Sequence, residues 1–305
     1  MARRRRADDD VAAVSTIEPN SPKELVQPMT DTGPHPEDPK EASDLPPWEL
    51  TEDDLMKIIF YSPAGHGKTT LLGTGVGDER ISPMLILDFE GGLKSIRSKI
   101  LRVPIDQLGV IPPEIDRAHV VKISEWEDFQ RVYDILESGQ HEYRAVAVDS
   151  LSEVNYLNLS TIVGKQVADP RVDHDPDIPY QEDYLRSISQ MRRLIRFFRD
   201  LPMHVFFTSG AVEAQDAKSR KFQYRPALTG KLVTELPGLV DTIAYLAVVE
   251  DGEENYRSLY FQPTERFMAK DRSEGGCLGA WLDLPNATHP ALPTMLDRLM
   301  GVEAV

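Results

Sequence analysis

The sequence predicts an α/β fold: a mostly parallel central sheet flanked by helices, with antiparallel strands added toward the C-terminus. Three observations indicate this fold class. From about residue 50, short apolar runs alternate with segments of helical periodicity, which is the pattern of βαβ units. A glycine-rich turn joins the first run to the first helix, and an acidic residue ends two later runs. Strands that are apolar throughout are typical of a parallel sheet covered on both faces.

Composition limits the possible functions. The chain has 305 residues, with 34 basic and 50 acidic side chains and a net charge of −16. This balance argues against attraction of the whole surface to nucleic acid or anionic membranes, so any contact with DNA must be local. The single cysteine, Cys277, excludes an intramolecular disulfide and a cysteine-based zinc cluster. No apolar run approaches the ~20 residues that span a bilayer, and we expect no membrane partner.

The chain is predicted to have two parts. Residues 1–49 are rich in Pro, Asp and Glu and carry few large apolar side chains, so we expect a disordered acidic tail. The arginines at 3–6 are followed by acidic residues rather than an apolar segment, which excludes a secretory signal. A solvated terminus is the favoured interpretation of this charged run, and an arm that contacts nucleic acid or a partner is the alternative. Residues 50–305 are predicted to form one globular domain.

The elements of that domain follow in order along the chain. Strands are predicted at residues 56–61, 84–88, 119–123, 145–149, 204–208, 242–249 and 258–262. Helices are predicted from Lys68 to about residue 73, over 126–138 and over 180–201. The last helix has apolar residues every three or four positions. A polar, glycine-containing segment at 251–255 separates the last two strands and predicts a hairpin turn, hence antiparallel pairing.

The first strand leads into a turn with the composition of a phosphate-binding P-loop. Its residues are Ser62, Pro63, Ala64, Gly65, His66, Gly67, Lys68 and Thr69, and Thr70 follows. Glycines let successive backbone N–H groups turn around an anion, and the start of the next helix adds further N–H groups. Lys68 can reach the β- and γ-phosphates of a nucleotide, and Thr69 can coordinate Mg²⁺. Ser62 replaces the first glycine of the pattern, and His66 stands at a variable position.

A nucleotide hydrolase also needs an acid for the metal ion and a group that orients or deprotonates the attacking water. Both are expected at the carboxyl ends of parallel strands. Asp149 ends the apolar run 145–148 and is predicted to hold Mg²⁺, with capping of the next helix as the alternative. Glu90 follows another strand beside two glycines and is predicted to activate the water. Asp88 and Glu153 are alternative candidates.

These segments, taken with later ones, resemble a known family. The specific pieces are Asp88-Phe89-Glu90-Gly91-Gly92-Leu93, Gly230-Lys231-Leu232, Leu236-Pro237-Gly238-Leu239-Val240-Asp241 and Ala269-Lys270-Asp271-Arg272. With the P-loop they resemble the RecA-like ATPase core, and more narrowly the phage-encoded RecA-like ATPases, some of which are single-strand annealing proteins. The resemblance covers roughly residues 55–285.

The resemblance implies a RecA-like fold, ATP and Mg²⁺ as cofactors, and the cytoplasm of a bacterial host as the location. It gives Glu90 the water-activating role and Asp149 the magnesium. Related proteins often carry Gln or His after the next strand, where this chain has Thr208 and Ser209. The residue that senses the γ-phosphate is therefore not identified by the sequence.

Lys270 and Arg272 are two residues apart, so on a strand both would point to one side. In RecA-like rings and filaments such a basic pair touches the γ-phosphate held by a neighbouring subunit, and the resemblance implies this catalytic role here. The physical basis is that of an arginine finger, a fixed cation that stabilises transition-state charge. Surface salt bridges are the alternative.

A polar segment after the 204–208 strand is predicted to bind single-stranded DNA. Its candidate residues are Lys218, Arg220, Lys221, Phe222, Tyr224 and Arg225. Cations that follow phosphates, interleaved with aromatic rings that stack on bases, describe a sequence-tolerant site. RecA-like proteins place a DNA-binding loop at this point of the fold. An ordinary basic hairpin is an equally favoured interpretation.

The sequence thus predicts an ATP-hydrolysing RecA-like protein that acts on single-stranded DNA in phage recombination or replication, by annealing or strand handling. Self-association into a ring or filament is expected, and a single-strand-binding protein is a further candidate partner. One alternative is a nucleotide-dependent assembly switch that binds ATP and a protein partner without DNA. Another is a ring helicase motor, ranked lower because no second domain for loading or strand separation is evident.

Overall fold

The computed structural model describes residues 54–215, 221–252 and 254–302. The predicted tail lies outside the described residues. The strands are β1 (Lys57–Ser62), β2 (Met84–Asp88), β3 (Ile100–Arg102), β4 (Ala118–Lys122), β5 (Ala145–Asp149), β6 (His204–Gln215), β7 (Phe222–Pro226), β8 (Thr242–Asp251), β9 (Glu254–Tyr260) and β10 (Trp281–Leu284). The helices are α1 (Lys68–Leu72), α2 (Trp126–Glu137), α3 (Leu151–Val167), α4 (Gln181–Arg199), α5 (Leu232–Glu235) and α6 (Ala291–Leu299). Short 3₁₀ helices are η2 (Leu93–Lys99), η3 (Ile105–Gln107), η4 (Leu236–Gly238) and η5 (Glu274–Gly276).

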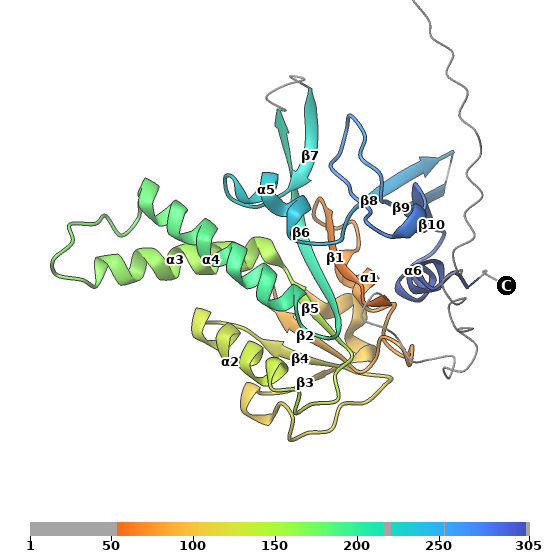
Figure 1. The fold of residues 1–305 in the computed structure, drawn as a ribbon, viewed down its shortest axis with the longest axis horizontal. Coiled ribbons are helices and arrows are strands. Elements are labelled where there is room, and N and C mark those ends of the chain that lie inside the picture. Colours follow the sequence, from red (N-terminus) through yellow and green to blue (C-terminus); the bar gives the residue numbers. More distant parts are fainter. Residues whose placement is uncertain (1–53, 216–220, 253, 303–305) are drawn as a thin grey trace, which may run out of the picture. The chain divides into compact units, whose positions relative to one another are not determined.

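The described strands form one sheet with the order β10-β9-β8-β1-β6-β5-β2-β4-β3, and β7 pairs with the far part of β6 (Figure 1). The pairs from β8 through β1, β6, β5, β2 and β4 to β3 are parallel. Antiparallel pairing joins β8 to β9, β9 to β10 and β6 to β7. The predicted fold class, a mostly parallel sheet with antiparallel strands toward the C-terminus, is confirmed.

Alternate side chains of β1 enter two separate cores. Ile59 and Tyr61 belong to the core covered by α2, α3 and α4, whereas Ile58 and Phe60 belong to the core covered by α1, η2 and α6. All four side chains are at most 1% exposed, and burial of each stabilises the fold by about 2 kcal/mol. Figure 1 shows these two groups of helices on opposite sides of the strands. The turn that follows β1 therefore starts from a firmly held strand.

The register brings the carboxyl ends of several strands to one edge of the sheet. Tyr61, near the end of β1, is aligned with Ser209 on β6 and with Tyr245 on β8. On β2 and β5, Asp88 is aligned with Asp149. Because these strands are parallel, the residues that follow them meet beside the P-loop.

Each predicted strand and helix is present, with ends that differ by a few residues. The largest difference is β6, which continues to Gln215 rather than ending at Thr208, because its outer part pairs with β7. The pattern does not predict β3, β7, β10, α3 or α6. Helix α3 buries Asn155 and Asn158 among its apolar residues, so it lacks the one-sided apolar stripe that marks an amphipathic helix.

Candidate functional site

The P-loop turns sharply because two glycines adopt left-handed backbone angles. Gly65 has a φ of 80° and Gly67 a φ of 101°, which residues with a Cβ rarely adopt. Gly67 precedes α1, and the Leu71 N–H donates to its carbonyl at 2.9 Å. The loop therefore ends directly in the first turn of a helix, as the sequence predicts.

Lys68 folds back over this loop. Its ammonium donates to the carbonyl oxygens of Ser62 at 3.1 Å and Pro63 at 3.3 Å. Burial lowers the pKa of Lys68, while the charges of Glu90 and Asp149 oppose that shift. The lysine therefore lies within electrostatic reach of both predicted acids.

Asp149 ends β5 with its carboxylate enclosed by hydroxyl groups. Its side chain is 2% exposed. Thr69 Oγ1 donates to Asp149 Oδ2 at 2.8 Å, and Thr208 Oγ1 donates to Oδ1. Burial raises the pKa of Asp149, and the two threonine bonds oppose that rise. The predicted metal pair, Thr69 and Asp149, is thus brought together, and these oxygen donors fit Mg²⁺, which takes few protein ligands beside water and phosphate.

Glu90 lies beyond the end of β2 and is exposed. The Ser150 hydroxyl donates to Glu90 Oε1 at 2.5 Å, and Ser150 itself is fully buried. The Asp149–Ser150 peptide bond is cis. Ser150 thus links the predicted water-activating acid to the predicted metal acid. Sequence reasoning gives Ser150 no role, although its place directly after Asp149 is the signal that could have found it.

The alternative candidate Asp88 is engaged within the fold. The Gly91 N–H donates to Asp88 Oδ1 at 2.7 Å, and Arg102 Nη1 lies 3.3 Å from Oδ2. Asp88 therefore fixes the turn that carries Glu90, which favours Glu90 as the water-activating residue. Glu153, the other alternative, lies in the first turn of α3.

Thr208 and Ser209 occupy the position at which the sequence leaves the γ-phosphate sensor open. Thr208 holds Asp149, as described above. The hydroxyl groups of Ser209 and Ser152 lie 3.1 Å apart, and the Gly210 N–H donates to Ser152 at 3.0 Å. Both residues thus connect β6 to the acid and to the first turn of α3.

Arg257 on β9 is a residue of the site that sequence reasoning misses. Its Nε donates to the carbonyl oxygen of His66 in the P-loop at 2.6 Å. A Cβ placed on Gly67 would lie 2.9 Å from the same Nε. The His66 ring nitrogen Nδ1 lies 3.3 Å from the Leu246 carbonyl oxygen. No sequence signal identifies Arg257, because it is 191 residues from its partner.

Lys270 and Arg272 lie toward the amino end of β8. Lys270 forms an antiparallel bridge with Ile243, and its ammonium donates to the carbonyl oxygen of Val240 at 2.7 Å. Arg272 is exposed and lies 3.4 Å from Asp241. Neither residue lies at the P-loop of its own chain. A contact with the nucleotide of a neighbouring subunit does not require that it should. Their finger role stays a prediction.

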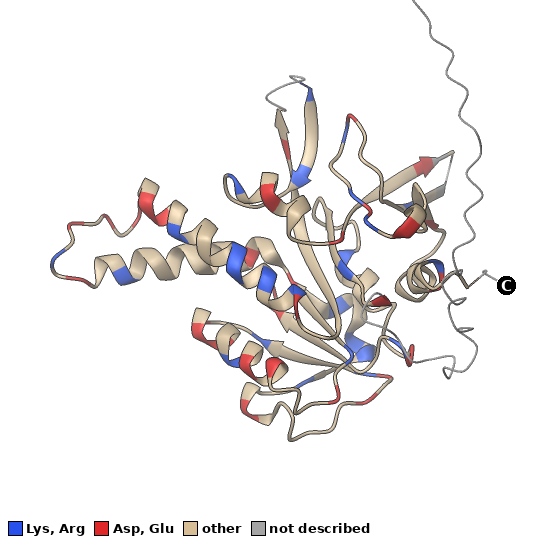
Figure 2. Ribbon diagram, in the orientation of Figure 1, with Lys and Arg blue, Asp and Glu red and all other residues tan. Residues whose placement is uncertain are grey.

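The described part of the predicted DNA segment lies at and beside β7, which pairs with β6 in a hairpin that extends away from the helices (Figure 1). Lys218 and Arg220 lie outside the described residues. Phe222 is 62% exposed, and Lys221 forms an exposed ion pair with Glu265 at 2.6 Å. Figure 2 shows basic residues near both ends of β7.

The inner end of β7 is packed against the sheet. Tyr224 stacks on Tyr245 with ring centroids 5.7 Å apart, and its carbonyl accepts from the Tyr61 hydroxyl at 3.1 Å. Arg225 is half-buried, and its Nε lies 3.3 Å from Gln223 Oε1. The hairpin therefore presents Phe222 and Lys221 at the surface, while the Tyr224 ring takes part in packing.

In the described part of the chain, every helix is too short or too polar to cross a membrane. The same residues contain no cluster of three or more His, Cys, Asp or Glu side chains able to hold a metal ion.

Comparison with known proteins locates the site within a recognised domain. A family model described as an AAA domain matches residues 55–273. A solved structure of a KaiC-like protein from the hyperthermophilic archaeon Pyrococcus horikoshii OT3 is similar at 12% identity, over 67% of this chain and 77% of that chain, with a TM-score of 0.35. No curated protein matches the chain. The family match contains the P-loop and both acids.

Proposed function

The chain belongs to the AAA-domain family of P-loop ATPases, and on this premise we propose that it binds ATP with Mg²⁺ and hydrolyses it. One observation carries the proposal. Lys68, Thr69, Asp149 and Glu90 come from three strand ends that are far apart in the sequence, yet hydrogen bonds and charge join them around one loop.

The binding part of the mechanism rests on the P-loop. Backbone N–H groups of the loop receive the phosphates, and Lys68 exchanges its carbonyl partners for β- and γ-phosphate oxygens. Thr69 and Asp149 would hold Mg²⁺, which neutralises charge on those phosphates when bound. Thr208 keeps the Asp149 carboxylate in place.

The chemical part of the mechanism assigns the proton to Glu90. Water attacks the γ-phosphorus, the bond from the γ-phosphorus to the bridging oxygen breaks, and Glu90 accepts the proton that the water loses. Ser150 donates to Oε1 of Glu90 and so sets the direction of the carboxylate. The exposed position of Glu90 gives water access to it.

Glu90→Gln tests this assignment. We expect turnover to fall by about 10²- to 10⁴-fold, because the amide accepts no proton, while ATP affinity stays near the wild-type value. Phosphate release and equilibrium ATP binding are the measurements. Glu153→Gln is the matched control, since Glu153 is the alternative acid on the neighbouring helix, and it should retain turnover. Full turnover in Glu90→Gln, or its loss in Glu153→Gln, would contradict the assignment.

The proposal extends to single-stranded DNA at the β6–β7 hairpin, in phage recombination or replication. The exposed Phe222 ring and the adjacent Lys221 support it, because an aromatic face beside a cation suits stacked bases and phosphates. The family resemblance of the sequence supports the biological setting. With a net charge of −16, the chain offers DNA a local site rather than a general surface.

Phe222→Ala tests the DNA part separately. Loss of one stacked base should weaken binding of a single-stranded oligonucleotide about tenfold at low salt. Phe197→Ala, which removes a less exposed ring from α4, is the control and should bind normally. If the wild-type protein binds no DNA and DNA does not change its ATPase rate, the proposed DNA site on the hairpin is wrong, while the proposed ATPase activity is unaffected. Assembly driven by ATP alone would then favour the alternative function, a nucleotide-dependent assembly switch that does not use DNA.

A further inference from the structure

The order of strands gives the nucleotide site a direction. On one side of β1 lie β6, β5 and β2, whose ends carry Thr208, Asp149 and the turn to Glu90. These acids mark the γ-phosphate end of a bound nucleotide. A triphosphate that lies along the loop must therefore direct its sugar and base toward the other side, where β8, β9 and β10 are found.

A small cavity lies on that other side, directly against α1. Its volume is about 50 Å³, which is enough for a few water molecules but not for a whole nucleoside. Its lining includes Thr70, Leu246, Arg257, Leu284, Asn286 and His289. It thus joins the helix that follows the P-loop to the last two strands and to the loop after β10.

Arg257 connects this cavity to the P-loop. Its Nε is bound to the His66 carbonyl oxygen, so the guanidinium lies alongside the loop. Among the described residues, its terminal nitrogens form no further hydrogen bond or ion pair. A guanidinium plane held in this way can stack on an aromatic ring or donate to a ribose or phosphate oxygen.

His289 supplies a second polar group, a ring nitrogen that can still form a hydrogen bond. Its Nε2 atom is shielded from solvent and has no hydrogen-bond partner among the described residues. A shielded polar atom without a partner is costly, unless a ligand or water completes it. Asn286 is exposed and lines the same opening; its Oδ1 accepts from the N–H and the hydroxyl of Thr288, so its NH₂ group is what it offers to a ligand.

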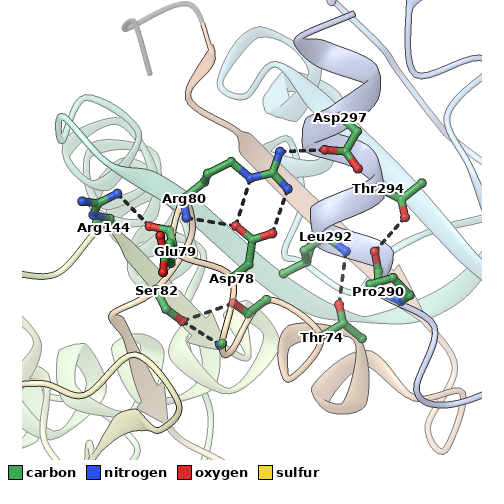
Figure 3. Close-up of polar contacts among 12 residues, drawn as sticks. Thr74, Asp78, Glu79, Arg80, Ser82, Arg144, Pro290, Leu292, Thr294 and Asp297 are labelled. Atoms are coloured by element: carbon green, nitrogen blue, oxygen red, sulfur yellow. Dashed lines mark hydrogen bonds and ion pairs between the residues drawn. The ribbon is translucent and has the colours of Figure 1, made fainter. Parts of the chain in front are cut away.

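The loop that carries these residues is held in place from its far end. Figure 3 shows that α6 is tied to the segment after α1. The Leu292 N–H donates to Thr74 Oγ1 at 3.1 Å, and Arg80 forms an ion pair with Asp297 at 2.6 Å. The cavity is therefore a preformed feature between two fixed elements.

We infer that this cavity and its mouth form the nucleoside subsite of the nucleotide site, with Arg257, Asn286 and His289 as the residues that recognise the sugar and base. The inference rests on the proposed function. The volume admits only an edge of a base or ribose, so the ring face lies over the mouth, between Arg257 and Leu284. His289 and Asn286 then contact polar atoms on the inserted edge.

Two ligands separate the subsite from the phosphate site. Tripolyphosphate carries the phosphates of ATP without a nucleoside. Ala287→Phe fills the mouth of the cavity from an exposed position. We expect it to lower ATP affinity at least about tenfold and to leave tripolyphosphate affinity unchanged. His289→Ala should lower ATP affinity about three- to tenfold, again without effect on tripolyphosphate. Titration calorimetry measures both ligands.

Two control variants complete the experiment. Asp283→Phe adds the same ring on the exposed face of β10, away from the buried Leu284, and should bind both ligands normally. Lys68→Ala should weaken both ligands. Equal losses of ATP and tripolyphosphate affinity in Ala287→Phe, or no loss of ATP affinity, would overturn the subsite. If wild type binds neither ligand, the proposed function fails, and the subsite fails with it.

Discussion

Lys68 and Lys270 show how two regions of one sheet use the same side chain differently. Both ammonium groups donate to two backbone carbonyls, and burial lowers the pKa of both. Around Lys68, at the carboxyl edge, the nearby charges are the acids Glu90 and Asp149. Around Lys270, near the amino end of β8, the positive charge of Arg272 lowers the pKa further, and only Asp241 opposes this shift.

The carbonyl partners make the difference clearer. Those of Lys68 belong to its own loop, five and six residues away, so phosphate oxygens can replace them without loss of a tertiary contact. Those of Lys270, on Pro237 and Val240, lie about thirty residues earlier. Lys270 thus connects its own segment to η4 and to the residues just before β8. The first lysine is poised for a ligand, whereas the second also holds the fold together.

The largest expected effect tests whether the amino-end region acts on a neighbouring subunit. Arg272 is exposed, and its 3.4 Å pair with Asp241 contributes less than about 1 kcal/mol. If it serves as a finger, Arg272→Ala lowers turnover by about 10³-fold with unchanged folding. Phosphate release per subunit is measured over a range of protein concentrations. Arg266→Ala, an exposed arginine on the same segment, is the control. Wild-type turnover in Arg272→Ala would remove the finger.

Lys68→Ala should give the next largest effect, at the other edge. Loss of the cation that reaches the β- and γ-phosphates is expected to lower turnover by about 10²-fold or more and to weaken ATP binding. The unfolding midpoint should stay close to wild type, because only loop-local carbonyls lose a partner. Phosphate release and thermal unfolding together check this. A marked loss of stability in Lys68→Ala would show that Lys68, like Lys270, stabilises the fold, and the proposed difference between the two lysines would be wrong.

Lys270→Met should mainly affect stability. Two half-buried carbonyl oxygens lose their donor, and we expect the free energy of unfolding to fall by about 2 kcal/mol. Urea denaturation measures this change. Lys122→Met, at an exposed position on β4, is the control and should change stability little. Unchanged stability in Lys270→Met would mean that its carbonyl contacts contribute nothing, and the lysine would then be free for a neighbouring subunit.

The smallest expected effect has the opposite sign. Burial raises the pKa of Asp149 in the folded chain, so its ionised form opposes folding at neutral pH. Asp149→Asn should therefore stabilise the nucleotide-free protein by about 1 kcal/mol at pH 7. This gain should shrink as the pH falls below the raised pKa of folded Asp149, and it should vanish near the ordinary aspartate pKa of 3.8, where the carboxyl is protonated in the folded chain and largely so in the unfolded chain. Thermal unfolding against pH measures it, and the variant should lose the stabilisation that Mg²⁺ with ATP gives.

Much of the fold and of the phosphate end of the site could be predicted because their signals are local. The apolar runs before Asp88 and Asp149 mark parallel strands, and the glycines before Lys68 mark the loop. The bond between Thr208 and Asp149 and the one from Arg257 to the P-loop could not be predicted, since their partners are 59 and 191 residues apart. Helix α3 escapes prediction because its buried face includes asparagines.

Strand β6 has a consequence for how the two ends of the molecule communicate. It pairs with β1 as far as Gly210 and with β7 from Ala211, without interruption. Its twelve residues extend about 40 Å at ~3.3 Å each, from the core to the hairpin. The hairpin and the Thr208 hydroxyl that donates to Asp149 thus belong to one continuous strand. We hypothesise that ligand binding at the hairpin shifts this strand and so changes the position of the Asp149 carboxylate. If a ligand bound to the hairpin leaves the hydrogen-exchange rate of the Thr208 amide unchanged, the hypothesis is wrong.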